Sequence, residues 1–192
     1  MTTILKAFLA ALAGLALGLW ATAALLADGG PFDVVSLGPW NVATRAGAID
    51  ADPYTRAALE RSGEIPIALG EGLQMIARVD DAGRPLEPDC VYRVGPHVPA
   101  ARYWTLGVVD LKGFPIDNPA ERHVFRSSEI LRQPDGSFAI YVSGSAHAGN
   151  WLPVGRARRF ALVLRLYDSP LSATAGGIEK AAAPQIVRES CA

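Results

Sequence analysis

The feature that most constrains this chain is an apolar run near its N-terminus. Residues 7–27 read AFLAALAGLALGLWATAALLA, twenty-one positions without a charged side chain. At a rise of about 1.5 Å per residue, a helix of this length crosses the roughly 30 Å hydrocarbon core of a bilayer. The run therefore predicts a single transmembrane anchor, preceded by a short stub of residues 1–6.

The charges on either side of this run predict its orientation. Lys6 precedes it, whereas Asp28 and Asp33 follow it. By the positive-inside rule, the N-terminus is cytoplasmic and the chain after Asp28 lies outside the cytoplasm. A cleaved signal peptide is the alternative, because Ala21-Thr22-Ala23 fits a signal-peptidase site. The anchor is favoured, since the apolar run continues past that site through Leu26.

The chain has two cysteines, Cys90 and Cys191. An even cysteine count in a domain outside the cytoplasm favours a disulfide between them. Two unpaired thiols are the alternative. The wide spacing of the two residues excludes a zinc ribbon and a Cys-x-x-Cys redox site.

The residues after the anchor divide into a connector and a domain. Residues 28–49 are punctuated by glycine and proline and are predicted to be the connector. Within it, Trp40 either caps the domain or lies at the membrane interface, where indole rings are enriched. Residues 50–192 are predicted to form the folded domain.

Short strands dominate the predicted domain, after one helix. Asp50 or Asp52 can accept its first backbone amides, Pro53 suits its first turn, and Gly63 suits its exit. From residue 67 onward, alternating apolar residues recur between turns. The strongest strands are 103–109 and 160–167, and 130–142 is predicted to be a hairpin. Six to eight short strands predict a mainly β fold, a β-sandwich or jelly roll.

Several motifs, in their order along the chain, resemble one known family. They are Asp52-Pro53-Tyr54-Thr55-Arg56, Ala101-Arg102-Tyr103-Trp104-Thr105-Leu106 with Asp110, Pro134-Asp135-Gly136-Ser137, Asn150-Trp151-Leu152-Pro153, the strand from Phe160 to Tyr167, and Pro184 to Arg188. Over roughly residues 50–190 the chain resembles the bacterial domain-of-unknown-function family 1214. The resemblance implies a β-sandwich and no assigned activity. Members are often fused to a companion domain, family 1254, in place of which this sequence carries the apolar run.

Together with the anchor, the resemblance to a bacterial family implies a location in the cell. The protein is expected in the inner membrane as a single-pass protein with a cytoplasmic N-terminus and a periplasmic domain.

One stretch carries residues that could perform hydrolysis. Ser145 and His147 lie close together in Ser143-Gly144-Ser145-Ala146-His147, after a predicted strand. The stretch lacks the Gly-x-Ser-x-Gly pattern and the strand-to-helix setting of a nucleophile elbow, so a flexible loop is favoured. A hydrolase acting on an envelope substrate remains the alternative function.

Other classes of ligand are not expected. No His-x-His or other ligand spacing predicts a metal site, and no phosphate-binding or dinucleotide motif predicts a cofactor. Eighteen basic residues against nineteen acidic ones leave a net charge of -1, without the basic excess typical of nucleic-acid binding.

Aromatic and planar polar residues are the stronger candidates for a binding site. The set consists of Asn150, Trp151, Arg102, Tyr103 and Arg165. Aromatic faces beside a few polar groups suit a sugar or a peptide. The alternative is that these aromatic rings pack in the core. The preferred function is a non-catalytic binding or scaffolding module for an envelope glycan, a peptide or a partner protein.

The orientation can be tested with a reporter. Alkaline phosphatase fused after Ala192 is expected to be active, because its disulfides form only outside the cytoplasm. A β-galactosidase fusion at the same position should be inactive, and the opposite pattern would contradict the orientation. Retention of the protein in membranes after carbonate extraction would favour the anchor over a cleaved signal peptide.

Overall fold

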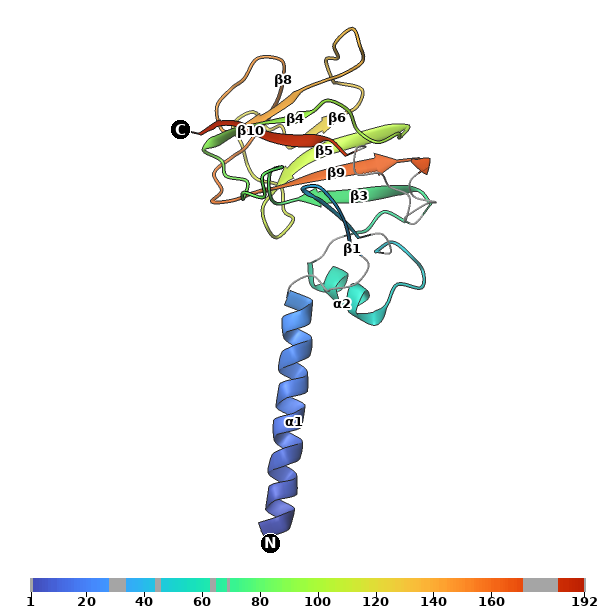
Figure 1. Cartoon of the computed structure of the whole chain (residues 1–192), viewed down its shortest axis with the longest axis vertical. Coiled ribbons are helices and arrows are strands. Elements are labelled where there is room, and N and C mark those ends of the chain that lie inside the picture. The colour runs from blue at the N-terminus through green and yellow to red at the C-terminus, as the bar shows by residue number, and fades with distance from the viewer. Residues whose placement is uncertain are drawn as a thin grey trace.

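The fold is known from a computed structural model, which describes residues 2–27, 34–43, 46–62, 65–68, 70–170 and 183–191 (Figure 1). Within these residues the elements are α1 (Thr2–Ala27), β1 (Val34–Leu37), β2 (Trp40–Ala43), α2 (Pro53–Ser62), β3 (Gly72–Ala77), β4 (Cys90–Gly95), β5 (Tyr103–Val109), β6 (Val124–Arg126), β7 (Ile140–Ser143), β8 (Asn150–Pro153), β9 (Ala161–Tyr167) and β10 (Gln185–Cys191). The prediction of a mainly β domain after one long apolar helix is confirmed.

The strands form two sheets that share one core. The six-stranded sheet has the order β1-β2-β3-β9-β5-β6, and the four-stranded sheet has the order β10-β4-β7-β8. Aromatic contacts join the layers: Tyr92 meets Phe160 edge to face with ring centroids 5.7 Å apart, and Trp104 stacks on Phe138 at 5.3 Å. Figure 1 places the six-stranded sheet on the side of α1 and α2, and the four-stranded sheet on the far side.

Strand alternation explains which side chains reach the core. Along β5, Trp104, Leu106 and Val108 are buried, while Tyr103 and Thr105, on either side of Trp104, are only partly buried. Because successive side chains in a strand point to opposite faces, these two lie on the outer face of the six-stranded sheet. The same alternation in the four-stranded sheet separates Tyr141 and Trp151 from their buried neighbours.

The predicted connector is wrong for residues 34–43. These residues form the β1–β2 hairpin, which extends the six-stranded sheet by pairing with β3. Trp40 is fully buried and its indole N–H donates to the Pro184 carbonyl at 2.7 Å, so it lies in the core rather than at the membrane interface. Trp40 and Val42 alternate with exposed residues, and they become buried only because β2 pairs with the edge of β3. The sequence pattern alone did not reveal this pairing. Residues 28–33 of the predicted connector lie outside the described residues.

The predicted 130–142 hairpin is also only partly correct. The tight turn exists, with the Gln133 amide donating to the Ser137 carbonyl at 2.8 Å, but residues 130–132 are not a strand. β7 pairs instead with β4 and, in parallel, with β8. The side chain of Asn150 takes the place of a strand partner for Leu131, as described below.

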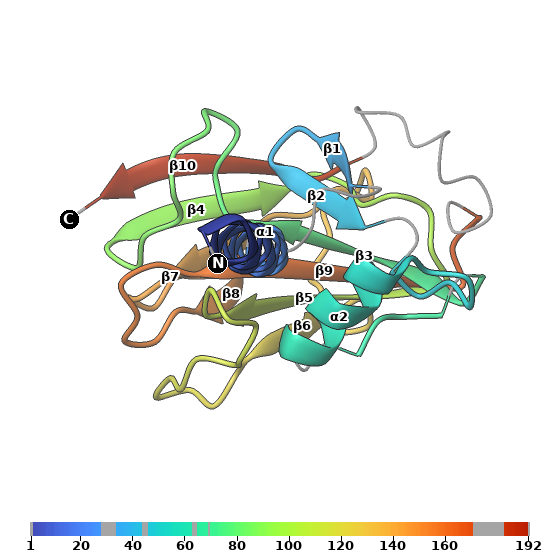
Figure 2. The same cartoon turned by 90° about the horizontal axis from the view of Figure 1, so that it is seen from below.

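The two helices lie next to each other on one side of the sandwich. The 26 residues of α1 are long and apolar enough to cross a membrane, a property that signal sequences share. The helix already begins at Thr2, and so includes Lys6. Of the two carboxylates expected to cap α2, Asp50 and Asp52, it is Asp52 that accepts the amides of Tyr54 and Thr55, at 2.9 and 3.1 Å. Gly63, at the predicted exit of this helix, lies outside the described residues. Figure 2, viewed from the α1 side, shows both helices in front of the sheets.

The Trp40 side chain provides a test of how the β1–β2 hairpin is held. Trp40→Ala should lower the free energy of unfolding by about 3–5 kcal/mol, the usual cost of emptying a buried aromatic site. For a domain of this size the melting temperature should fall by roughly 10 °C. Asn41→Ala, an exposed neighbour in the same strand, is the control and should change the melting temperature little. Equal melting temperatures for both variants would contradict a core position of Trp40.

Candidate functional site

Asn150, the first predicted site residue, is buried and bound to the backbone. Its Oδ1 accepts the Leu131 amide at 2.8 Å, and its Nδ2 donates to the carbonyls of Leu131 at 2.9 Å and Ala139 at 3.0 Å. A buried amide with all these partners is satisfied within the protein. The structure thus gives Asn150 the task of holding residues 131–139 against β8.

Trp151 lies on the opposite side of β8 and is partly exposed. Its indole N–H donates to Ser143, at 3.1 Å to Oγ and 3.3 Å to the carbonyl, which fixes the ring against the end of β7. Cross-strand register places Trp151 opposite Tyr141, and Tyr141 opposite Arg93. We call Arg93, Tyr141 and Trp151 the aromatic row.

Two further side chains border the aromatic row. The His147 ring stacks on Tyr141, with centroids 3.7 Å apart and planes at 17°. At the Arg93 end of the row, Arg93 Nε donates to Glu189 Oε1 at 3.0 Å, and both side chains are about one-third exposed. The outer face of the four-stranded sheet therefore combines aromatic rings with the Arg93–Glu189 ion pair, which carries no net charge.

A short parallel connection produces the His147 stack. β7 and β8 run parallel, yet only residues 144–149 join them. Parallel strands are usually joined by a crossover of a dozen or more residues. A link of six residues has to stay close to the two strands it joins, and this brings His147 onto the Tyr141 ring.

The predicted hydrolytic pair is not assembled. The Ser145 carbonyl accepts the Ser143 hydroxyl at 2.7 Å, and His147 Nδ1 lies 2.9 Å from the Ala148 carbonyl. Within residues 70–170, all of which the structure describes, no hydrogen bond joins Ser145 to His147. With its ring stacked on Tyr141, His147 is not placed as the general base of a serine nucleophile.

The remaining predicted site residues lie on the other outer face. Tyr103 tilts against Tyr167 with centroids 6.0 Å apart, and Arg165 Nε donates to Gln74 Oε1 at 2.8 Å. Arg102 is 83% exposed and pairs with Asp168 at 3.6 Å. Since these side chains belong to the six-stranded sheet or its edge, they cannot meet Trp151 at one concavity. Sequence motifs could not show this, because strand order decides which faces coincide.

A broad open groove lies at one end of the sandwich. It has a volume of about 1950 Å³ and runs between the loops at 87–89, 110–119 and 154–159. Acidic and basic side chains both line it, among them Asp110, Asp117, Arg156 and Arg159. The groove reaches Gly144 but does not include the aromatic row. Among the described residues, no cluster of three histidine, cysteine or acidic side chains could hold a metal ion.

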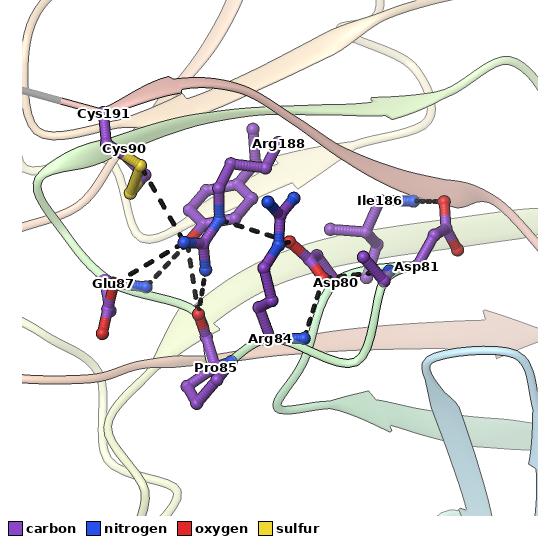
Figure 3. A network of polar contacts seen from close by, with 11 residues as sticks. Asp80, Asp81, Arg84, Pro85, Glu87, Cys90, Ile186, Arg188 and Cys191 are labelled. Atoms are coloured by element: carbon purple, nitrogen blue, oxygen red, sulfur yellow. Dashed lines mark hydrogen bonds and ion pairs between the residues drawn. A yellow bond between two sulfur atoms is a disulfide. The ribbon is translucent and has the colours of Figure 1, made fainter.

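A network of ion pairs holds the last strand, β10, to the turn after β3 (Figure 3). The Asp80 carboxylate is 1% exposed; its Oδ2 lies 2.8 Å from Arg84 Nε and 3.2 Å from Arg188 Nε. Arg188 also donates to the Pro85 carbonyl, and Asp81 accepts the Ile186 amide at 2.8 Å. Arg188 Nε is buried and faces Asp80 only as an ion pair, without a hydrogen bond. The ion pairs and the backbone contacts together indicate that the network positions β10.

The predicted disulfide lies at the end of the same strand. Cys90 and Cys191 are bonded, with their Cα atoms 3.9 Å apart. The two residues are direct partners in the antiparallel pairing of β4 and β10. The bond thus ties the end of β10 to the start of β4.

The pKa of Asp80 reflects two opposing effects, burial of the carboxylate and its contacts with Arg84. Burial alone would raise the pKa of this carboxyl, but hydrogen bonds from the Arg84 backbone and side chain, together with the positive charge of Arg84, lower it below its ordinary value. A lowered pKa in the folded state stabilises the fold above the ordinary pKa. That stabilisation is lost as the pH falls through the lowered pKa.

Asp80→Asn should therefore destabilise the domain in a pH-dependent way. We expect a loss of about 3 kcal/mol at pH 7, near the lower end for breaking a buried pair, because Arg84 is half exposed. The difference from the wild type should shrink below the ordinary carboxyl pKa, about 3.8, as measured by urea denaturation. Glu129→Gln removes one partner of the exposed Arg126–Glu129 pair and should have little effect at either pH. An Asp80→Asn effect that is the same at pH 7 and pH 3 would contradict the assignment.

Comparison with known proteins places the chain in a family. It is similar in structure to the VPA0106 protein from Vibrio parahaemolyticus, with a TM-score of 0.62 and 18% identity over 92% of this chain and 44% of that chain. It is also similar to an uncharacterised protein from Burkholderia cenocepacia, with a TM-score of 0.41 and 21% identity over 89% of this chain and 50% of that one.

At these identities, the Vibrio match supports the fold alone, and this chain spans less than half the length of that protein. No curated protein matches the sequence. The profile described as "Protein of unknown function (DUF1214)" matches residues 71–171, just over half of the chain. The chain therefore belongs to the DUF1214 family.

Proposed function

We propose that this protein is a membrane-anchored, non-catalytic module that binds a glycan of the bacterial envelope through the aromatic row. The proposal places α1 in the inner membrane, with the N-terminus in the cytoplasm and the sandwich in the periplasm. The distribution of charges around the apolar run supports this topology.

The observation that carries the proposal is the cross-strand alignment of Arg93, Tyr141 and Trp151. Strand alternation puts these side chains on the outer face of the four-stranded sheet. That sheet lies on the far side of the sandwich from α1 (Figure 1), where a ligand in the envelope can reach it. Partly exposed rings supply apolar faces, while the Arg93–Glu189 pair supplies donors and acceptors without net charge. Sugars present apolar C–H faces and many hydroxyls, so this combination suits a glycan better than a charged ligand.

The hydrolase alternative receives less support. It needs a serine within hydrogen-bond reach of a general base. Ser145 and His147 are instead engaged separately, by Ser143 and by the Tyr141 ring. A peptide or a partner protein is a further possible occupant of the same face, and the experiment below separates it from a glycan.

The experiment compares two aromatic substitutions on opposite faces. Full-length protein in detergent is sedimented with purified peptidoglycan sacculi. Trp151→Ala should weaken retention about fivefold, since an aromatic contact contributes roughly 1 kcal/mol. Tyr103→Ala removes a ring of similar burial from the six-stranded sheet and should leave retention unchanged.

Thermal melting and a digested probe complete the test. Trp151 is only partly buried, so Trp151→Ala should lower the melting temperature less than Trp40→Ala does. Sacculi stripped of stem peptides by an amidase should still retain the protein. Loss of retention after that treatment would indicate a peptide ligand, and no retention on either probe would contradict the proposal.

A further inference from the structure

Two exposed isoleucines flank α2. Ile49 is 97% exposed and Ile65 is 87% exposed, the highest values for large apolar side chains among the described residues outside α1. Burying such a side chain is usually worth about 1.5–3 kcal/mol, so leaving both in water is unfavourable. Single exposed apolar residues are common and need no explanation by themselves. The significance of these two therefore depends on where they lie relative to α1.

The segments that carry these isoleucines are held in place. Arg56 of α2 donates to the Ile49 carbonyl at 2.6 Å, which ties that segment to the helix. On the other side, Pro66 and Ile67 line a pocket of about 90 Å³ together with Leu59 of α2 and residues of β2 and β3. The helix and its flanks therefore form a cover over the β2–β3 part of the outer face of the six-stranded sheet.

This cover lies beside the end of α1 that leads into the domain. α1 and α2 are in contact, and both views show them next to each other on the same side of the sandwich (Figures 1 and 2). The apolar run 7–27 has about the length needed to cross the hydrocarbon core, so it leaves little helix to project beyond the membrane. An element in contact with α1 at this end then lies in the headgroup layer.

We infer that Ile49 and Ile65 insert into the outer surface of the same membrane and form a second, peripheral contact beside the α1 anchor. Tyr54, on the first turn of α2 and 41% exposed, is a side chain typical of this layer. Insertion to the boundary of headgroups and acyl chains is the usual depth of interfacial segments. Such a contact keeps the six-stranded sheet toward the bilayer and the aromatic row away from it.

The test measures how close each isoleucine position is to lipid. Because both native cysteines are in the disulfide, Ile49→Cys or Ile65→Cys adds a single reactive thiol for an environment-sensitive NBD label. The full-length protein is reconstituted in phosphatidylcholine nanodiscs with or without a lipid carrying a nitroxide near the headgroup. Quenching at positions 49 and 65 should be at least about twofold stronger than at the control position, since interfacial segments lie within about 5–10 Å of such a quencher.

Leu131→Cys is the matched control. Leu131 is 67% exposed, and its backbone is bound to Asn150 of β8, in the sheet far from α1. Labels at 49 and 65 that are quenched no more than the label at 131, and are open to aqueous iodide, would overturn the inference. They would point to a protein partner or to water around α2.

The inference rests on the α1 anchor of the proposed function. A separate measurement therefore distinguishes failure of the anchor from failure of the second membrane contact. The intact mass of the mature protein shows whether residues 7–27 are retained. A mass that corresponds to cleavage after Ala23 would overturn both the anchor and the membrane contact. A retained helix without quenching at 49 and 65 would overturn the contact alone.

Discussion

The alternation of side chains along β5 and β9 is the constraint on which the rest of the molecule depends. These two neighbouring interior strands of the six-stranded sheet supply Trp104, Leu106, Leu162 and Leu164 to the core. Because side chains alternate along a strand, the residues between those that point into the core must point to the outer face of the sheet. The position of each outward side chain relative to α1 then follows from the stacking of the two sheets.

This arrangement gives the two outer faces different surroundings. The outer face of the six-stranded sheet is partly covered by α2 and lies toward α1, whereas that of the four-stranded sheet points away (Figures 1 and 2). A domain tethered to a membrane can exchange ligands most easily through the distal face. The aromatic row lies there, while Tyr103 and Arg165 lie on the proximal face. The proposed tether and the proposed ligand site thus lie on opposite sheets.

The last strand closes the sandwich by polar and covalent contacts. β10 follows residues outside the described set, and its pairing with β4 is reinforced by Arg188, by Asp81 and by the disulfide. Buried ion pairs often add little net stability compared with apolar packing, although removing one partner is costly. The specific partners of Arg188 therefore fix the register of an edge strand more than they strengthen the core.

The sequence by itself determined the elements that depend on local pattern. The apolar run, the Asp52 cap and the strands at 103–109 and 160–167 follow from neighbouring residues. The cysteine count favoured a disulfide, because only one pairing of two cysteines exists. Only the tertiary structure decided where Trp40, Asn150, Tyr103 and Trp151 lie. Their positions depend on which strands become neighbours and which sheet lies toward α1. These are relations between residues up to 144 positions apart, which no local pattern records.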